Sequence, residues 1–233
     1  MSAPVALVAG VGRGTGGAVA RRFTAAGYRV ALLARSESRL KEFEAELDGS
    51  LAIPCDVTDP DAVEAAVAKC RAELGAPVVV IHNAARGTFG TFMEIDPGDV
   101  EENFRVNAMS LLYLARAVAP AMIEQGGGAI IVTGNTSAWR GKPGYAGFAP
   151  TKAAQRILAE AIARDLGPKG IHVAYVVIDA TIDLRWTRRR NPEYRDEDFA
   201  QPDDLAEGIY WVAQQPRSAW SFNVELRPFK ETW

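Results

Sequence analysis

The stretch LVAGVGRGTGGAVA, Leu7 to Ala20, joins a short apolar run to a glycine-rich turn and then to an amphipathic segment. Gly10, Gly14 and Gly16 lie in the turn, where residues without a side chain let the backbone bend tightly and approach a ligand. A helix that starts there presents free N–H groups and the positive end of its dipole to an anion. The stretch predicts a strand, a turn that binds the diphosphate of a dinucleotide, and a helix. The alternative is that the glycines only let the helix pack closely on the strand.

Short apolar runs and amphipathic segments alternate along the rest of the chain. Strands are predicted at 5–9, 30–33, 51–54, 78–82, 129–133, 173–178 and, in the closing SFNVELRPF, within 221–229. Helices are predicted at 17–26, 39–47, 60–74, 100–124, 151–166 and 203–214. Because strands that are nearly all apolar need cover on both faces, we expect an α/β fold. It is a three-layer, doubly wound Rossmann-type parallel sheet of about seven strands with helices on both faces.

Length and composition limit the class of protein. The 233 residues are 48% hydrophobic and 24% charged, and α/β folds of this size often form one unit, so we expect a single domain over residues 1–233. The formal net charge is −3 and the cationic residues are mostly scattered, which argues against a nucleic-acid surface. The first apolar run breaks at Gly10, so no signal peptide or membrane span is expected. The two cysteines lack metal-ligand spacing, and we expect a reduced, cytoplasmic protein without a metal site.

The end of the second predicted strand carries a cation where many dinucleotide sites carry an acid. Ala34 and Arg35 stand where an Asp or Glu would hold the ribose 2′-hydroxyl of NAD(H). Arg35, together with Arg13 in the glycine turn, can meet a 2′-phosphate, which favours NADP(H) over NAD(H). Otherwise both arginines are solvated surface residues.

One long segment breaks the alternation of strands and helices. Residues 179–202 read DATIDLRWTRRRNPEYRDEDFAQP, which is polar, rich in arginine and without a clear period. Loops of this length are often functional, so we expect a substrate loop or lid here. Its arginines either attract an anionic substrate or are simply solvated, and solvation is the more common case.

Several motifs together resemble the short-chain dehydrogenase/reductase family over nearly the whole chain. They are the G-x-x-x-G-x-G spacing of the turn, HNAA at 82–85, Asn107 and Lys152. The resemblance implies an NAD(P)-dependent oxidoreductase that acts on a small-molecule substrate. It also implies a homodimer or homotetramer packed through the helices at 100–124 and 151–166. Further cofactor contacts follow from it, with Asp56 and Val57 near the adenine and Asn83 and Ala84 at the ribose.

Two positions of this chain depart from the family pattern. In typical members a tyrosine transfers the proton, a lysine binds the nicotinamide ribose, a serine holds the substrate oxygen and an asparagine organises a water relay. Lys152 and Asn107 match, but Phe148 stands at the tyrosine position and Asn135 at the serine position. A phenyl ring has no ionisable proton, so acid–base catalysis at residue 148 is impossible. The Asn135 amide can still donate a hydrogen bond to a substrate oxygen.

These residues favour an NADPH-dependent reductase of a carbonyl, imine or conjugated enone with an altered proton-delivery site. Its catalytic candidates are Asn107, Asn135, Lys152 and Tyr145. Tyr145 lies seven residues before Lys152, a spacing similar to that of the enoyl reductases, so an enoyl-type reductase is an alternative. Pro150 places Tyr145 in the loop before the helix. A second alternative is an NADP(H)-binding sensor or partner subunit without turnover.

Overall fold

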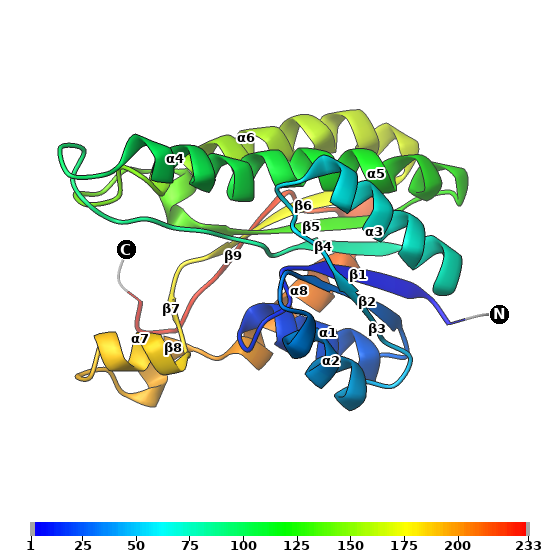
Figure 1. Cartoon of the computed structure of the whole chain (residues 1–233), viewed down its shortest axis with the longest axis horizontal. Helices are drawn as coiled ribbons and strands as arrows, with labels where there is room; N and C mark the ends of the chain where they lie inside the picture. Colours follow the sequence, from blue (N-terminus) through cyan, green and yellow to red (C-terminus); the bar gives the residue numbers. More distant parts are fainter. Residues whose placement is uncertain (1–2, 232–233) are drawn as a thin grey trace.

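A computed structural model, which describes residues 3–231, contains a seven-stranded sheet with the strand order β3-β2-β1-β4-β5-β6-β9 (Figure 1). Every neighbouring pair in this sheet is parallel. The strands are β1 Val5–Ala9, β2 Arg29–Ala34, β3 Leu51–Pro54, β4 Val79–His82, β5 Gly128–Asn135, β6 Ile171–Ile178 and β9 Asn223–Leu226. The predicted parallel Rossmann-type sheet is therefore confirmed.

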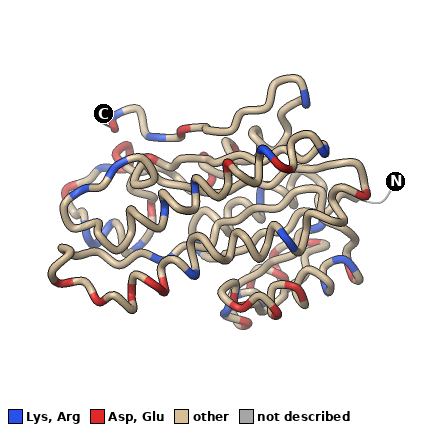
Figure 2. The backbone as a smooth tube through the Cα atoms, turned by 90° about the horizontal axis from the view of Figure 1, so that it is seen from above, with Lys and Arg blue, Asp and Glu red and all other residues tan. Residues whose placement is uncertain are grey.

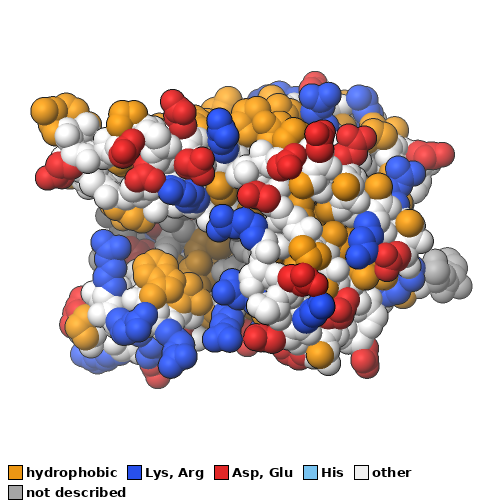
Figure 3. All heavy atoms as spheres, in the orientation of Figure 1, with side chains coloured by type: hydrophobic (Ala, Val, Ile, Leu, Met, Phe, Trp, Pro, Cys, Tyr) orange, Lys and Arg blue, Asp and Glu red, His pale blue; other side chains and the backbone are white. Residues whose placement is uncertain are grey.

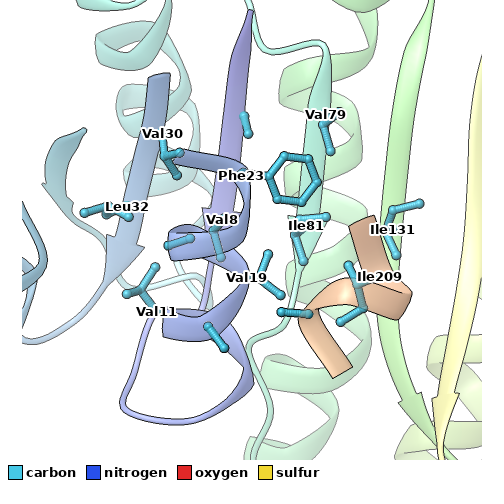
Figure 4. Packing of buried hydrophobic residues seen from close by; sticks show 14 of the residues in the cluster. Val8, Val11, Val19, Phe23, Val30, Leu32, Val79, Ile81, Ile131 and Ile209 are labelled. Carbon is cyan, nitrogen blue, oxygen red and sulfur yellow. The ribbon is translucent and has the colours of Figure 1, made fainter. Parts of the chain in front are cut away.

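Helices cover both faces of the sheet and make the three layers seen in Figure 1. One face carries α1 Thr15–Ala25, α2 Glu37–Glu46 and α8 Pro202–Ala213, and the other carries α3 Pro60–Glu73, α5 Ser110–Glu124 and α6 Ala149–Leu166. On the α1 and α8 side, Phe23 and Val19 of α1 pack with Ile81 of β4 and Ile209 of α8 (Figure 4). Full burial of a side chain such as Phe23 contributes about 1.5–3 kcal/mol to folding.

Local sequence signals fix where several helices begin. The Asp59 side chain accepts hydrogen bonds from the backbone N–H groups of Asp61 and Ala62, and Pro60 occupies the first turn of α3. The segment 56–59 thus forms a turn that caps α3. Asp96 does the same for α4 Pro97–Phe104 by accepting from the Gly98 N–H. Pro150 lies in the first turn of α6, which leaves Tyr145 in the preceding loop.

The predicted continuous helix over 100–124 is interrupted. Helix α4 ends at Phe104, a π-helical turn covers Arg105–Met109, and α5 begins at Ser110. Such π turns occur mostly as single turns inside α-helices, and the predicted helix over 100–124 did not include one. Asn103 and Asn107 are both fully buried next to or within this turn.

The run Pro97–Glu124 is long and apolar enough to cross a membrane by length and composition alone. Half of its most apolar window is buried inside the protein, and Leu114, Val118 and Met122 belong to the core cluster on the α3 and α5 side of the sheet. These contacts make it a core helix of the fold. Lys and Arg on the one hand and Asp and Glu on the other are both spread over the backbone (Figure 2), and the thiols of Cys55 and Cys70 are buried and free.

The segment 179–202 has more regular structure than its sequence indicates. Strand β7 Thr181–Ile182 pairs in parallel with β8 Phe199–Ala200, and α7 Arg185–Arg190 lies between them. The Thr187 hydroxyl has the carbonyl oxygens of Ile182 and Leu184 within hydrogen-bond distance for its one proton and accepts from the Leu184 N–H, which ties α7 to β7. Because β7 follows β6 after two residues, the whole unit lies beyond the carboxyl ends of the strands (Figure 1).

Candidate active site

The backbone of the glycine turn is packed tightly against the loop after β4 and against itself. Gly10 has φ of +98°, and a Cβ there would lie 2.5 Å from the backbone N of Ala84. A Cβ on Gly16 would lie 2.2 Å from the Gly10 carbonyl oxygen. Both positions therefore require glycine, as the sequence predicts for a turn of this kind.

The start of α1 fits a bound phosphate group. Its N-cap residue, Gly14, offers no side-chain cap, and the hydroxyl of Thr15 is buried without a hydrogen-bond partner in the described chain. Free N–H groups at a helix N-terminus together with an unpartnered hydroxyl are donors for phosphate oxygens. The residues present thus fit the diphosphate of a dinucleotide.

The two arginines proposed for a 2′-phosphate lie at the surface beside this turn. Arg13 is exposed and its Nη2 lies 3.6 Å from the Glu42 carboxylate. Arg35 directly follows β2 and is exposed. Hydrogen bonds from Thr58, and then the charge of Arg35, hold the pKa of Asp56 below its ordinary value. Val57, next to Asp56, packs against the core on the α3 side.

Asn83 links the carboxyl ends of three central strands. Its Nδ2 donates to the Gly10 carbonyl oxygen at 3.0 Å, and its Oδ1 accepts from the Thr133 hydroxyl at 3.1 Å. The predicted ribose residues Asn83 and Ala84 therefore lie directly against the glycine turn, with Ala84 on Gly10. The crevice expected at this edge of a doubly wound sheet is where these residues meet.

Lys152 is buried beneath this crevice. Its side chain is 2% exposed and Nζ donates to the Thr133 carbonyl oxygen at 3.1 Å. Burial lowers the pKa of Lys152 to about 7. An ammonium group has three donors, and this hydrogen bond uses one, so Lys152 fits a site where a ribose hydroxyl would accept another.

Asn107 is held by the π turn against two loops. Its Nδ2 donates to the Arg86 carbonyl oxygen and to the Thr151 hydroxyl, each at 2.8 Å, and its Oδ1 accepts from the Arg86 N–H. Thr151 is the immediate neighbour of Lys152, so Asn107 positions the start of α6. One turn earlier, Asn103 donates to the Gly147 carbonyl oxygen and fixes the loop that carries Tyr145.

Phe148 and Tyr145 share one aromatic neighbour. The Phe148 ring centroid lies 5.4 Å from that of Phe89, and the Tyr145 ring meets Phe89 edge to face at 5.1 Å. Phe148 also packs against Gly87. The residue at the family's tyrosine position is therefore in an apolar ring cluster, and the nearby phenol belongs to Tyr145.

Asn135 is engaged at both ends of its side chain. Nδ2 donates to the Ile178 carbonyl oxygen at 3.1 Å, and Oδ1 accepts from the Ser137 N–H at 2.9 Å. The Nδ2 group carries two protons, and the bond to Ile178 uses one, which leaves one donor for a substrate oxygen. Asn135 therefore also joins the end of β5 to the end of β6.

A pocket of about 610 Å³ opens beside the site, and its lining includes Ser137 and Tyr145 but not Lys152, Asn107 or Phe148. Alternation along a strand predicts that Asn135, Thr136 and Ser137 do not all face the pocket. The strand ends at Asn135, however, and Thr136–Ala138 form a 3₁₀ turn that directs Ser137 to the pocket. The sequence did not show that the strand ends at Asn135, and for that reason it did not single out Ser137 as a residue of the pocket.

His82 and His172 lie within β4 and β6 and are not exposed. His82 Nε2 lies 2.6 Å from the Ser110 hydroxyl, and Nδ1 lies 3.3 Å from Gln155 Nε2. Burial, and secondarily the charge of Lys152, lowers the pKa of His82 to about 3, so His82 stays neutral near pH 7. Among residues 3–231, no group of three or more His, Cys, Asp or Glu side chains could hold a metal ion.

The segment that contains α7 lies between the glycine turn and the ring cluster of Phe89, Tyr145 and Phe148. The side chain of Leu184, just before α7, lies 2.9 Å from the Cβ position of Gly14, and the Arg190 guanidinium lies 5.9 Å from the Phe89 ring centroid. Figure 3 shows a hollow on this side of the molecule, with several Lys and Arg side chains on its rim. The segment 179–202 thus contacts both the glycine turn and the loop after β4.

Comparison with known proteins gives a consistent assignment. The family model described as short chain dehydrogenase matches residues 4–190. D-erythrulose reductase of Gallus gallus is 35% identical over 169 residues, which cover 72% of this chain and 67% of that protein. An uncharacterized oxidoreductase of Staphylococcus aureus strain USA300 is 26% identical over 226 residues, 96% of each chain.

Solved structures agree in fold and length. A metagenomic short-chain oxidoreductase in complex with NADP has 27% identity and a TM-score of 0.84, with 97% of both chains covered. An alcohol dehydrogenase from the archaeon Thermococcus sibiricus, complexed with 5-hydroxy-NADP, has 26% identity and a TM-score of 0.88, with 98% of both chains covered. With a family model that spans most of its length, this chain belongs to the short-chain dehydrogenase family, a family of NAD(P)-dependent oxidoreductases.

Proposed function

We propose that the protein is an NADPH-dependent reductase of a carbonyl, imine or conjugated enone whose proton-delivery site differs from the common family arrangement. The observation that carries this proposal is Phe148. It stands four residues before the buried Lys152, packs on Phe89 and Gly87, and places no ionisable group at that position. A substrate that depends less on a tyrosine acid, such as an imine or an enone, suits this site.

The cofactor assignment rests on the glycine turn and the two exposed arginines. Gly10, Gly14 and Gly16 would receive the diphosphate, and Arg13 and Arg35 would meet the 2′-phosphate of NADP(H). Asp56 and Val57 would lie at the adenine, and Asn83 and Ala84 at the ribose. Bound nicotinamide supplies the hydride, and the protein orients it. Two of the similar solved structures contain NADP or a derivative of it, which supports the preference.

Two buried residues would orient the reacting groups. Lys152, anchored on the Thr133 carbonyl oxygen, would donate to the nicotinamide ribose and place positive charge near the reacting oxygen. Asn107 would hold Lys152 in place through Thr151 and order water beside it. Asn135 would polarise the substrate oxygen with the Nδ2 proton that its bond to Ile178 does not use.

The pocket beside the site favours a second candidate function, an enoyl-type reductase that uses Tyr145. Tyr145 and Ser137 line the same pocket of about 610 Å³, which places two hydroxyl groups on its wall. Tyr145 also has the seven-residue offset from Lys152 that resembles enoyl reductases. In this case the phenol of Tyr145 would supply the proton that Phe148 lacks.

Cofactor binding is tested by titrating the purified chain with NADPH and NADH. We expect enhanced NADPH emission and quenched tryptophan fluorescence, with tighter binding of NADPH than of NADH. An Arg35→Ala variant should lose most of that preference, whereas Arg39→Ala, a nearby arginine on α2, should keep it. No signal with either nucleotide at millimolar concentration would contradict the oxidoreductase assignment itself.

Turnover is tested by following NADPH oxidation with matched ketones, imines and enones. Tyr145→Phe should abolish turnover if Tyr145 is the acid, and Tyr113→Phe on α5 serves as the matched control. Turnover that survives Tyr145→Phe would contradict the enoyl-type function and would support the reductase with an altered proton-delivery site. Nucleotide binding without turnover on any compound would identify a sensor or partner subunit instead.

A further inference from the structure

Helix α7 bridges the two sides of the crevice. At its start, Leu184 contacts the glycine turn at Gly14, and at its end Arg190 lies over the Phe89 ring in the loop after β4. The helix has six residues, and a rise of 1.5 Å per residue gives it a length of about 9 Å. Arg190 is therefore on the far side of the crevice from the glycine turn and close to the aromatic cluster.

The Phe89 ring connects Arg190 to the candidate proton donor. Phe89 meets the Tyr145 ring at 5.1 Å and the Phe148 ring at 5.4 Å, while the Arg190 guanidinium is 5.9 Å from the same ring centroid. The cation thus stands one aromatic ring away from the phenol of Tyr145. A small substrate beside Tyr145 would have a second functional group within reach of Arg190.

The charges on α7 differ in how they are neutralised. Arg188 forms ion pairs with Asp183 and Asp196, which fix α7 to the rest of its segment. Arg190 forms no ion pair with a carboxylate among residues 3–231, and the contact of its guanidinium with the Phe89 ring does not neutralise the charge. A guanidinium with its charge unpaired is suited to carboxylate or phosphate, because its planar donors match two oxygens at once.

We infer that Arg190 binds an anionic group, a carboxylate or a phosphate, on the substrate and so determines its specificity. This inference rests on the proposed reductase function, because the anion is recognised at the site where the substrate is reduced. The substrate class is then a small carbonyl, imine or enone that carries an anionic group.

The test compares pairs of compounds that differ only in the anion. Dihydroxyacetone phosphate is measured against dihydroxyacetone, and 4-oxopentanoate against its methyl ester, each with NADPH. The wild-type enzyme should prefer the anionic member of one pair by about tenfold or more in kcat/KM. Arg190→Gln should reduce that ratio about tenfold, mainly through KM, whereas Arg189→Gln should leave it unchanged. The pair that shows the effect identifies phosphate or carboxylate as the anion.

Several results would overturn the inference. One is equal kcat/KM for the two members of each pair. Another is a preference for the anionic member, measured as the ratio of the two kcat/KM values, that survives Arg190→Gln. A third is a loss of that preference in Arg189→Gln as large as in Arg190→Gln. A ratio that depends on Arg140, which lines the pocket beside Tyr145, would place the anion there instead. If neither pair turns over, calorimetry of the two anions on the NADP⁺-saturated protein decides, with binding to wild type and not to Arg190→Gln expected. No binding to wild type contradicts the inference.

The nucleotide titration separates this inference from the proposed function. A protein that binds NADPH and reduces neutral compounds without regard to Arg190 is a reductase with a different specificity. A protein that binds neither nucleotide fails at the earlier step.

Discussion

Lys152 and Phe148 lie on adjacent turns at the start of α6 and have opposite chemical character. Lys152 is a buried cation with one hydrogen bond, whereas Phe148 belongs to a cluster of rings. The sequence alone predicts the loss of a proton donor at 148. The structure adds that Phe89, which packs on Phe148, also contacts Tyr145, so the phenol of Tyr145 lies in the same ring cluster as Phe148.

The burial of Lys152 predicts a pH dependence of stability. With the pKa of Lys152 lowered to about 7, the unfolded chain binds more protons than the folded chain from about pH 7 up to the ordinary lysine pKa near 10.4. Stability of the cofactor-free protein therefore rises with pH in this window, and it is lowest below the folded pKa, where the buried cation is charged. We expect the free energy of unfolding in urea to rise by up to about 2 kcal/mol between about pH 7 and pH 8.5.

Lys152→Met should remove this rise, and Lys169→Met, at an exposed lysine, should retain it. The measurement stops at pH 8.5 because of the two buried thiols. Burial raises the pKa of Cys55 and Cys70 to about 11, so above their ordinary pKa the unfolded chain loses protons that the folded chain keeps, and stability falls. A Lys152→Met protein with an unchanged slope would show that Lys152 is not the group responsible.

At the scale of elements, the glycine turn and the π turn do the most to build the site. The glycine turn is tight because Gly10 and Gly16 approach the backbone of the loop after β4 and of the turn itself. The π turn directs Asn107 to the start of α6. The conformation of each turn depends on contacts with a loop that is distant in the sequence, so neither is determined by its own residues alone.

Two glycines of the same turn should respond differently to alanine. A Cβ on Gly16 would lie 2.2 Å from a backbone oxygen, whereas a Cβ on Gly12 has no atom within 4 Å. We expect Gly16→Ala to lower the free energy of unfolding by about 1–3 kcal/mol or more, and Gly12→Ala to change it by less than about 0.5 kcal/mol. Urea unfolding of both variants is the measurement. Equal losses would mean that the turn is not packed as described.

Asn107 should not tolerate a carboxylate. Its Nδ2 faces two acceptors, the Arg86 carbonyl and the Thr151 hydroxyl oxygen, and an aspartate there would replace a donor by an acceptor. We expect Asn107→Asp to lower the free energy of unfolding in urea by about 2–3 kcal/mol at pH 7, because the buried carboxylate would face two acceptors and no donor at the place of Nδ2. Asn223→Asp, where the exposed side chain accepts from Arg156, is the control and should be close to neutral. A small effect at 107 would show that water relieves the clash.

At the scale of the whole molecule, α5 and α6 lie side by side on the outer face of the sheet (Figure 1). They leave Ile123 and Ile157 exposed, with Ile157 at 61%. Apolar side chains on the outer face of two adjacent helices are suited to packing against a second copy, which is the arrangement that the family resemblance implies.

We predict a homodimer or homotetramer in solution. Light scattering coupled to size exclusion should give two or four times the mass of the chain. Ile157→Asp should shift the protein to smaller species because it buries a charge at the contact, whereas Met93→Asp, at an exposed loop residue, should not. A wild-type monomer at micromolar concentration would contradict the prediction.

The sequence by itself determined the parallel sheet, the places of its seven strands to within a few residues and the glycine turn. These follow from local patterns, because the period of apolar residues and the chemistry of turns act over a few neighbouring positions.

Only the tertiary structure decided which side chains meet in the crevice. Ser137 faces the pocket because β5 ends two residues earlier, Asn135 is held by Ile178, and Arg190 reaches the ring of Phe89 across about a hundred residues of chain. Such contacts depend on how separate loops pack against one another at the end of the sheet. No local period encodes that packing, and for this reason the fold could be inferred from the sequence while the arrangement of the site could not.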